Sequence, residues 1–151
     1  MRTLALSPFA GLAGIAPLAA RVIVGVIMAA HGLQKLLGGP ANFGGLLGQL
    51  GVPAPTLMAF VVTFVELVGG ILLILGLFSR LAALLLTVNL VVAIALVKWS
   101  VGLIAPMDQP GAGMELDLAL IAGFLVVLFA GPGPVSLDRI LGLDGDGQGR
   151  V

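Results

Sequence analysis

Four stretches of mostly apolar residues, each long enough to cross a bilayer, constrain this chain more than any other feature. They lie at about residues 17–37, 55–77, 81–104 and 114–130. A transmembrane helix needs about 20 predominantly apolar residues. None of the stretches shows the strict polar–apolar alternation of a barrel strand. Because backbone groups in lipid must bond within the protein, the sequence predicts an all-α membrane protein, a four-transmembrane-helix bundle.

The balance of residue types excludes several classes of protein. Charged residues make up 9% of the chain, whereas a soluble domain has about 25%. Seven basic residues balance seven acidic ones, so no basic surface for nucleic acid is expected. With no cysteine and one histidine, the chain's side chains are not expected to hold haem, an iron–sulfur cluster, structural zinc or another metal. Redox chemistry would need an organic cofactor or a partner protein.

The regions outside the spans predict three parts. Residues 1–16 are interrupted by proline and glycine, which favours a retained N-terminal interfacial segment over a cleaved signal peptide. Residues 17–131 form the four-helix membrane domain, and residues 132–151 form a tail. Within the tail, residues 135–141 fit one short amphipathic turn on the membrane surface. Residues 144–149 resemble the start of a calcium loop, but its later ligands are missing, so a flexible polar end is expected.

The basic residues near the span ends predict the orientation. Cytoplasmic loops carry an excess of lysine and arginine. One side of the predicted bundle has five arginines and the other has two lysines: Arg2, Arg21, Arg80, Arg139 and Arg150 against Lys35 and Lys98. Both termini and the tail are therefore expected to be cytoplasmic, in a multi-pass protein of a bacterial-type inner membrane. Arg21 and Arg80 are most simply interpreted as orientation signals that contact phospholipid.

Ionisable residues inside the first two spans are candidates for function, because such groups are costly in a membrane. His31 and Lys35 lie four residues apart and share one helical face with Gly32. Glu66 lies near the centre of the second span, on a face of small residues. Small residues let helices approach closely, so both faces are expected to point into the bundle.

The third and fourth spans carry four further polar residues. Asn89 shares a stripe with small residues and is expected to face inward. Lys98 lies about 180° away from it and is expected to extend outward to the membrane surface. Glu115 also lies on a small-residue stripe. Asp117 stacks with Phe124 on a face interpreted as lipid-facing, where its charge would only complement the helix dipole.

These positions predict a polar pocket in the outer half of the bundle, open beneath the loop at residues 38–53. His31, Lys35 and Glu115 fall toward the outer ends of their spans, and Glu66 and Asn89 lie near the middle. The alternative is structural, because a network of glutamate, lysine and histidine can simply hold helices together.

Several motifs together resemble the DoxX family over about residues 17–140. They are Arg21-x3-Gly25, His31-Gly32-x2-Lys35, Glu66-Leu-Val-Gly69-Gly70-x5-Gly76-Leu-Phe-Ser-Arg80, Gly113-Met-Glu115 and Gly131-Pro-Gly-Pro-Val-Ser136-Leu-Asp138. The resemblance implies a four-helix membrane protein whose polar motif positions are Arg21, His31, Lys35, Glu66, Arg80 and Glu115. Some DoxX-like proteins are associated with quinone-linked oxidation of sulfur compounds, and others with membrane oxidoreductase or oxidative-stress assemblies. The lack of cysteine excludes the dithiol relay of more distant four-helix redox proteins.

The leading hypothesis is a redox-associated subunit that interacts with a membrane quinone. His31 and Glu66 would exchange protons, and Lys35 would stabilise a developing oxyanion, so these three are the catalytic candidates. The candidates for cofactor binding are Arg21, His31, Glu66, Asn89 and Glu115. The alternative is a non-catalytic accessory or structural subunit of a larger membrane complex, partnered by another membrane protein or by further copies of itself. A small transporter is a minor third possibility, because the spans show no inverted repeat.

Overall fold

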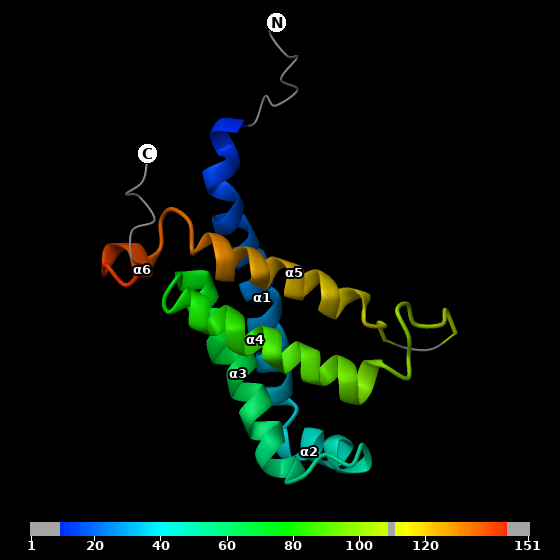
Figure 1. The fold of residues 1–151 in the computed structure, drawn as a ribbon. Coiled ribbons are helices and arrows are strands. Elements are labelled where there is room, and N and C mark those ends of the chain that lie inside the picture. Colours follow the sequence, from blue (N-terminus) through cyan, green and yellow to red (C-terminus); the bar gives the residue numbers. More distant parts are fainter. Residues whose placement is uncertain (1–9, 109–110, 145–151) are drawn as a thin grey trace, which may run out of the picture.

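The computed structural model describes residues 10–108 and 111–144, and within them the chain is helical with connecting loops and no strand (Figure 1). The elements in chain order are η1 (Ala10–Ile15), α1 (Ala16–Leu37), α2 (Pro40–Gln49), α3 (Pro55–Leu75), α4 (Ser79–Ala93), η2 (Ile94–Lys98), α5 (Glu115–Ala130) and α6 (Leu137–Ile140). η1 is a 3₁₀ helix, and η2 is a π-helical turn that continues α4. The first part of the predicted interfacial segment and most of the calcium-loop-like stretch lie outside the described residues.

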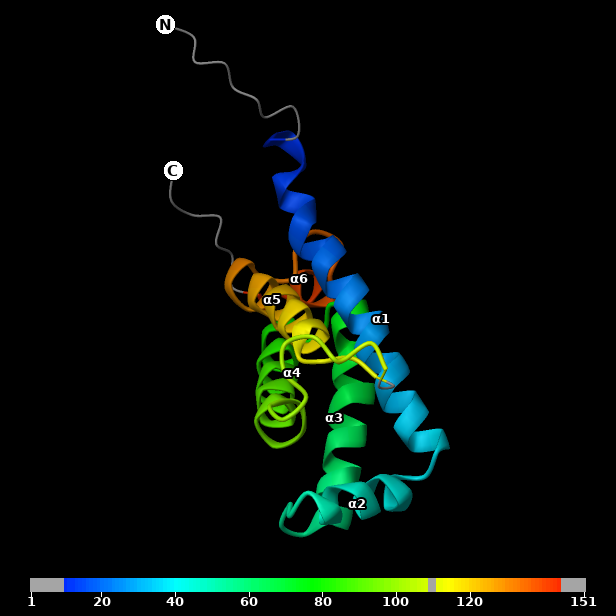
Figure 2. The same ribbon diagram turned by 90° about the vertical axis from the view of Figure 1, so that its right-hand side faces the viewer.

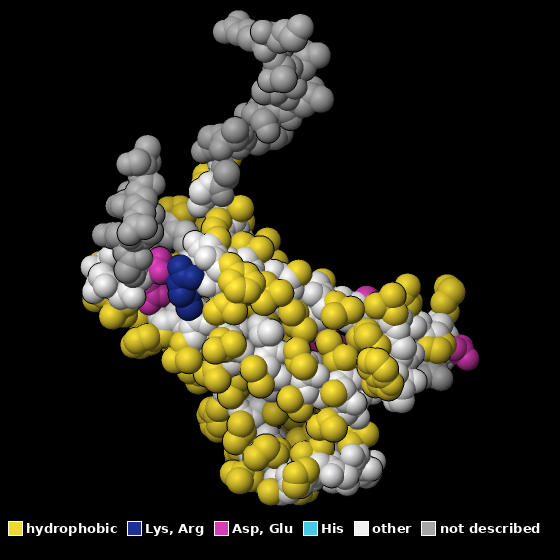
Figure 3. Space-filling model, viewed as in Figure 1, with side chains coloured by type: hydrophobic (Ala, Val, Ile, Leu, Met, Phe, Trp, Pro, Cys, Tyr) yellow, Lys and Arg dark blue, Asp and Glu magenta, His cyan; other side chains and the backbone are white. Residues whose placement is uncertain are grey.

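Three helices are long and apolar enough to cross a membrane: Ala16–Leu37, Pro55–Leu75 and Ser79–Lys98. The all-helical prediction is therefore confirmed, together with three candidate spans close to the predicted ranges. α5 occupies the fourth predicted range but has only 16 residues, so the four-span count stays a prediction. Much of the outer surface is apolar, and hydrophobic side chains cover most of the face in Figure 3.

The helices form two antiparallel pairs that cross each other. α1 packs along α3, and α4 packs along α5 (Figures 1 and 2). The pairs lie close together near α6, at the end where α3 passes into α4. α2 lies across the opposite end of α3, as Figure 2 shows most clearly. The bundle therefore has one end joined by the tail and another end covered by α2.

Glycine allows α1 and α3 to pack in close contact. A Cβ atom on Gly70 would lie 2.7 Å from the carbonyl oxygen of Gly25 and closer still to the amide nitrogen of Ala29. A Cβ atom on Gly32 would lie 2.6 Å from Cα of Leu67. Neither distance leaves room for a side chain. The predicted inward direction of the small-residue faces of these two helices is confirmed.

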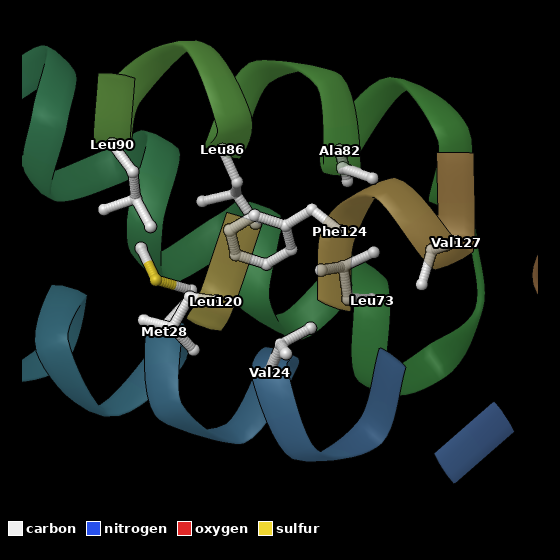
Figure 4. Packing of buried hydrophobic residues seen from close by; sticks show 10 residues of the cluster. Val24, Met28, Leu73, Ala82, Leu86, Leu90, Leu120, Phe124 and Val127 are labelled. Atoms are coloured by element: carbon white, nitrogen blue, oxygen red, sulfur yellow. The ribbon is translucent and has the colours of Figure 1, made fainter. Parts of the chain in front are cut away.

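A hydrophobic core fills the space between the pairs (Figure 4). Val24 and Met28 of α1 face Leu86 of α4 and Phe124 of α5, and Phe124 is fully buried. The prediction that the Phe124 face of α5 meets lipid is therefore wrong. The stripe that carries Glu115 is the outward one instead. Both faces of this helix are apolar, so hydropathy gives no preference for its rotation, and the fit of large side chains decides it.

Candidate functional site

A cavity of about 320 Å³ lies between the two helix pairs, at the end covered by α2. Most of its lining is aliphatic or aromatic, including Met28 of α1, Phe43 of α2, Met58 of α3 and Leu120 of α5. The polar residues that line it are His31, Lys35, Glu66, Asn89, Lys98 and Asp117. An apolar cavity with a few convergent polar groups is the usual form of a small-molecule site.

An ion pair and an amide join three helices at the cavity wall. The Lys35 ammonium on α1 forms an ion pair with Oε2 of Glu66 on α3. Asn89 on α4 donates from Nδ2 to Oε1 of Glu66, 3.1 Å away. Glu66 is buried, so both of its carboxylate oxygens are paired where water has little access. The Lys35 nitrogen also lies 5.4 Å from the centre of the Phe43 ring, a cation–π contact that ties α2 to the site.

His31 lines the same cavity one helical turn before Lys35. Its side chain is half-buried and makes no hydrogen bond with the part of the chain that the structure describes. An imidazole in this position can face a ligand without first breaking an internal bond. The structure thus brings four of the sequence candidates together: His31, Lys35, Glu66 and Asn89.

Lys98 also reaches the cavity, so its predicted outward direction is wrong. Its ammonium donates to the carbonyl oxygen of Ala112, 2.5 Å away. The π-helical turn explains the difference, because the Trp99 amide bonds to the Ile94 carbonyl, five residues back, at 2.8 Å. A π turn has more residues than an α turn, so every later position is rotated from where α-helical spacing would place it. The lysine therefore turns toward α5.

Asp117 is the polar residue that sequence reasoning missed. It lies in the first turn of α5, lines the cavity and is buried beside Leu120 and Phe124. Its Oδ2 atom is buried without a hydrogen-bond partner among the described residues. The spacing of Asp117, Leu120, Phe124 and Val127 is that of one helical face, which the large side chains could have identified as the core face.

Two sequence candidates lie away from the cavity. Glu115 is exposed at the start of α5 and does not line it. Arg21 lies toward the opposite end of α1, and it is 1% exposed, which contradicts its interpretation as a phospholipid contact. Its guanidinium instead donates to four backbone carbonyl oxygens at 2.6–2.8 Å, those of Leu73, Ile74, Pro132 and Val135. Arg21 therefore joins α1 to the end of α3 and to the tail.

The tail continues this network beyond Arg21. Asp138 accepts hydrogen bonds from the amides of Phe78, at 2.6 Å, and Ser79, at 2.8 Å. These amides begin α4, where helix N–H groups lack partners within the helix. Phe78 adopts a left-handed conformation, and Gly76, at φ 69°, ends α3 beside it. The predicted short helical turn is present as α6, and its carboxylate caps α4.

The cavity offers apolar side chains for contact with a ligand, and a cation, an amide, an imidazole and carboxylates that can bond its polar atoms. Glu66 is buried, so its charge is screened less than a charge at the surface. No group of three or more histidine, aspartate or glutamate side chains that could hold a metal ion occurs among residues 10–108 and 111–144.

Comparison with known proteins identifies the family. A family model described as DoxX matches residues 16–99. The chain belongs to the DoxX family. The match extends from α1 to just beyond η2, so it includes every polar residue of the cavity except Asp117.

Three relatives illustrate how far the similarity to DoxX-type proteins extends. An uncharacterized membrane protein of Mycobacterium tuberculosis is 36% identical over 80% of this chain and 78% of its own length. The Escherichia coli "Inner membrane protein YphA" is 31% identical over 92% of this chain and 99% of its own length. The Bacillus subtilis "Putative oxidoreductase CatD" is 40% identical over 56% of this chain and 60% of its own length. No solved structure matches the chain significantly.

Proposed function

We propose that this DoxX-family protein binds a membrane quinone in the cavity and takes part in its redox chemistry. The observation that carries the proposal is the Lys35–Glu66–Asn89 network at the wall of an otherwise apolar cavity. An ionisable group inside a membrane domain is costly, and one that lines a cavity is a candidate for ligand binding. The name of the Bacillus subtilis relative, an oxidoreductase, supports the same class of function.

Each polar group has a role in this proposal. Reduction of a quinone takes up protons together with electrons, and His31 and Glu66 would exchange these protons with the ring oxygens. Lys35 would stabilise negative charge that develops on a ring oxygen. The electrons would come from a partner protein or a soluble donor. Asn89 would hold the Glu66 carboxylate in position.

Quinone content of the purified protein tests the proposal. The full chain would be isolated in lipid nanodiscs, extracted with organic solvent and analysed by mass spectrometry, beside Glu66→Gln, His31→Ala and the distant control Asp144→Asn. We expect a nearly stoichiometric quinone in the wild type and in Asp144→Asn, and its loss in Glu66→Gln. Quinone content and turnover unchanged in both Glu66→Gln and His31→Ala would refute a role for the cavity.

We also propose a topology for the site. Four spans with both termini cytoplasmic would place the cavity in the outer half of a bacterial inner membrane, and the name of the Escherichia coli relative supports that location. The chain lacks cysteine, so single cysteines can be introduced and labelled without background. A cysteine at Gly45 of α2 should react with a membrane-impermeant maleimide in whole cells, and one at the exposed Ile140 of α6 should not. The reverse labelling pattern would show the opposite topology.

An accessory role is the second candidate, and one surface feature favours it. An apolar groove between α3 and α4 is lined by Phe64, Gly69 and Leu81, among others. Grooves with a small residue at the base suit packing of a helix from another membrane protein. Recovery of one membrane protein by crosslinking, with no quinone extracted from the wild type or from Glu66→Gln, would favour this function. A protein isolated only as a free monomer would count against it.

A further inference from the structure

The position of Asp117 indicates what kind of ligand the cavity takes. Asp117 is 9% exposed, and its buried Oδ2 has no hydrogen-bond partner among the described residues. A buried carboxylate oxygen without a partner is costly, so native structures rarely keep one without a reason. Asp117 lines the cavity, but Oδ2 itself is covered. A ligand in the cavity would supply the missing donor after the carboxylate rotates toward it.

The other charged groups of the cavity already have partners. Both oxygens of Glu66 are paired, one with Lys35 and one with Asn89. The Lys98 ammonium donates to a backbone carbonyl. The proposal takes Asp117 as ionised, with the nearby Lys98 ammonium as its balancing charge. Asp117 is then the carboxylate of the lining that has a buried oxygen without a partner among the described residues.

An ionised carboxylate accepts hydrogen bonds and donates none. A ligand oxygen placed against it must therefore carry a hydrogen. The two redox forms of a quinone differ in this respect, since the oxidised form presents carbonyl oxygens and the reduced form presents hydroxyl groups. A carbonyl oxygen would put a second acceptor against Asp117, whereas a hydroxyl group would satisfy it.

We propose that Asp117 accepts a hydrogen bond from a hydroxyl group on the bound ring, so that the cavity prefers a hydroxyl-bearing aromatic, of the quinol type, over its carbonyl form. This inference rests on the proposed function, because it takes a quinone-type ring as the ligand. It adds a specificity residue on α5 to the three-helix network of Lys35, Glu66 and Asn89.

The test uses two ring compounds that differ by one hydroxyl hydrogen. 4-Methoxy-1-naphthol has one hydroxyl group, and 1,4-dimethoxynaphthalene carries a methoxy group in its place. Equilibrium dialysis under anaerobic conditions would measure the binding of each to the full chain in nanodiscs, with empty nanodiscs to subtract partition into lipid. The variants are Asp117→Asn, which keeps the shape of the side chain, and Glu115→Gln, which removes an exposed charge two residues away.

We expect the naphthol to bind about tenfold or more tightly than the dimethyl ether, as the loss of a hydrogen bond to a charged group predicts. Asp117→Asn should reduce this preference to about twofold or less, and Glu115→Gln should leave it unchanged. The comparison of the two compounds in the wild type needs no variant, so equal binding would refute the inference even if Asp117→Asn fails to fold.

Three results would overturn the inference, and they separate it from the proposed function. Equal binding of both compounds to the wild type, lost in Glu66→Gln, would show a ring-binding cavity in which Asp117 does not select the hydroxyl group. Binding of neither compound above the empty-nanodisc background, together with no extracted quinone, would refute both. A preference for the naphthol that persists in Asp117→Asn would assign the selection to another residue.

Discussion

The two ends of the bundle bury polar side chains with different results. At the end joined by the tail, Arg21 donates to four carbonyl groups, and Asp138 accepts from two amides. At the end covered by α2, both oxygens of Glu66 are paired, but Asp117 has an oxygen without a partner among the described residues, and it lines a cavity. The tail end also has one such atom, the Ser79 hydroxyl oxygen, but Ser79 lines neither this cavity nor the groove between α3 and α4. The second end therefore differs in placing its unpartnered group where a ligand can lie.

The difference shows why burial of a charge does not by itself indicate function in a membrane protein. Arg21 is more deeply buried than Glu66 or Asp117, yet its partners are all backbone groups of this chain. Its role is to bond carbonyl groups at the end of α3 and in the tail. The Leu73 carbonyl also accepts from the Gly76 amide, whereas a carbonyl in the last turn of a helix, such as that of Ile74, lacks a partner within the helix. A polar group that lines a cavity and lacks partners is the better candidate for ligand binding.

The largest effect on folding should come from Arg21→Met. The variant leaves buried carbonyl groups at the tail end without donors, and we expect a loss of about 3–5 kcal/mol in the free energy of unfolding. Thermal unfolding in detergent would measure it, with Arg21→Lys as a matched variant that should recover only part, because an ammonium cannot reproduce the guanidinium geometry. A melting curve of Arg21→Met identical to that of the wild type would contradict the structural role assigned to the tail end.

The α1–α3 contact that connects the two ends should be the next most sensitive. Gly70→Ala places a methyl group against the backbone of α1, and we expect a loss of about 1–3 kcal/mol from overpacking. The matched control is Gly45→Ala in α2, where a Cβ atom meets nothing within 4 Å. This control should be neutral or slightly stabilising, because alanine favours a helix over glycine. Similar losses in both variants would argue against a close helix contact.

Within the tail end, the two aspartates should differ. Asp138→Asn weakens the cap on α4, and we expect a loss of about 1–2 kcal/mol. Asp144 pairs with Arg80 at 3.1 Å in a partly exposed position, so Asp144→Asn should cost about 1 kcal/mol or less. Chemical unfolding of the two variants side by side would measure both. Equal losses would show that the tail is held by charge in general and not by the cap.

The smallest effect on stability should come from replacing the polar pair at the cavity end. Lys35→Met combined with Glu66→Leu removes both charges, and we expect an unfolding free energy within about 1 kcal/mol of the wild type. Lys35→Met alone should be less stable than the double variant, because it leaves a buried carboxylate without its cation. The double variant should still lose quinone in the extraction assay. A loss of unfolding free energy in the double variant as large as that in Arg21→Met would show that the Lys35–Glu66 pair has a structural role.

The membrane character of the protein and much of its site could be predicted from the sequence. The apolar stretches placed both ends of α1 and α3 and the start of α4 to within two residues, but the third predicted span ran to residue 104, six residues beyond the end of η2. Glycine spacing identified the faces on which α1 and α3 meet. His31, Lys35, Glu66 and Asn89 stood out because polar groups are rare within such spans, and the structure collects them around one cavity. The motifs that resembled the DoxX family were confirmed by the family match.

Tertiary structure decided how α5 is rotated and how α4 ends. Hydropathy is enough to place a helix in a membrane, but it carries no information on rotation when both faces are apolar, so only packing around Phe124 turned Asp117 inward. The π turn that redirects Lys98 depends on backbone hydrogen bonding that spacing does not reveal. Arg21 found its carbonyl partners in residues more than 50 and 110 positions away, and such contacts exist only once the helices and the tail have assembled.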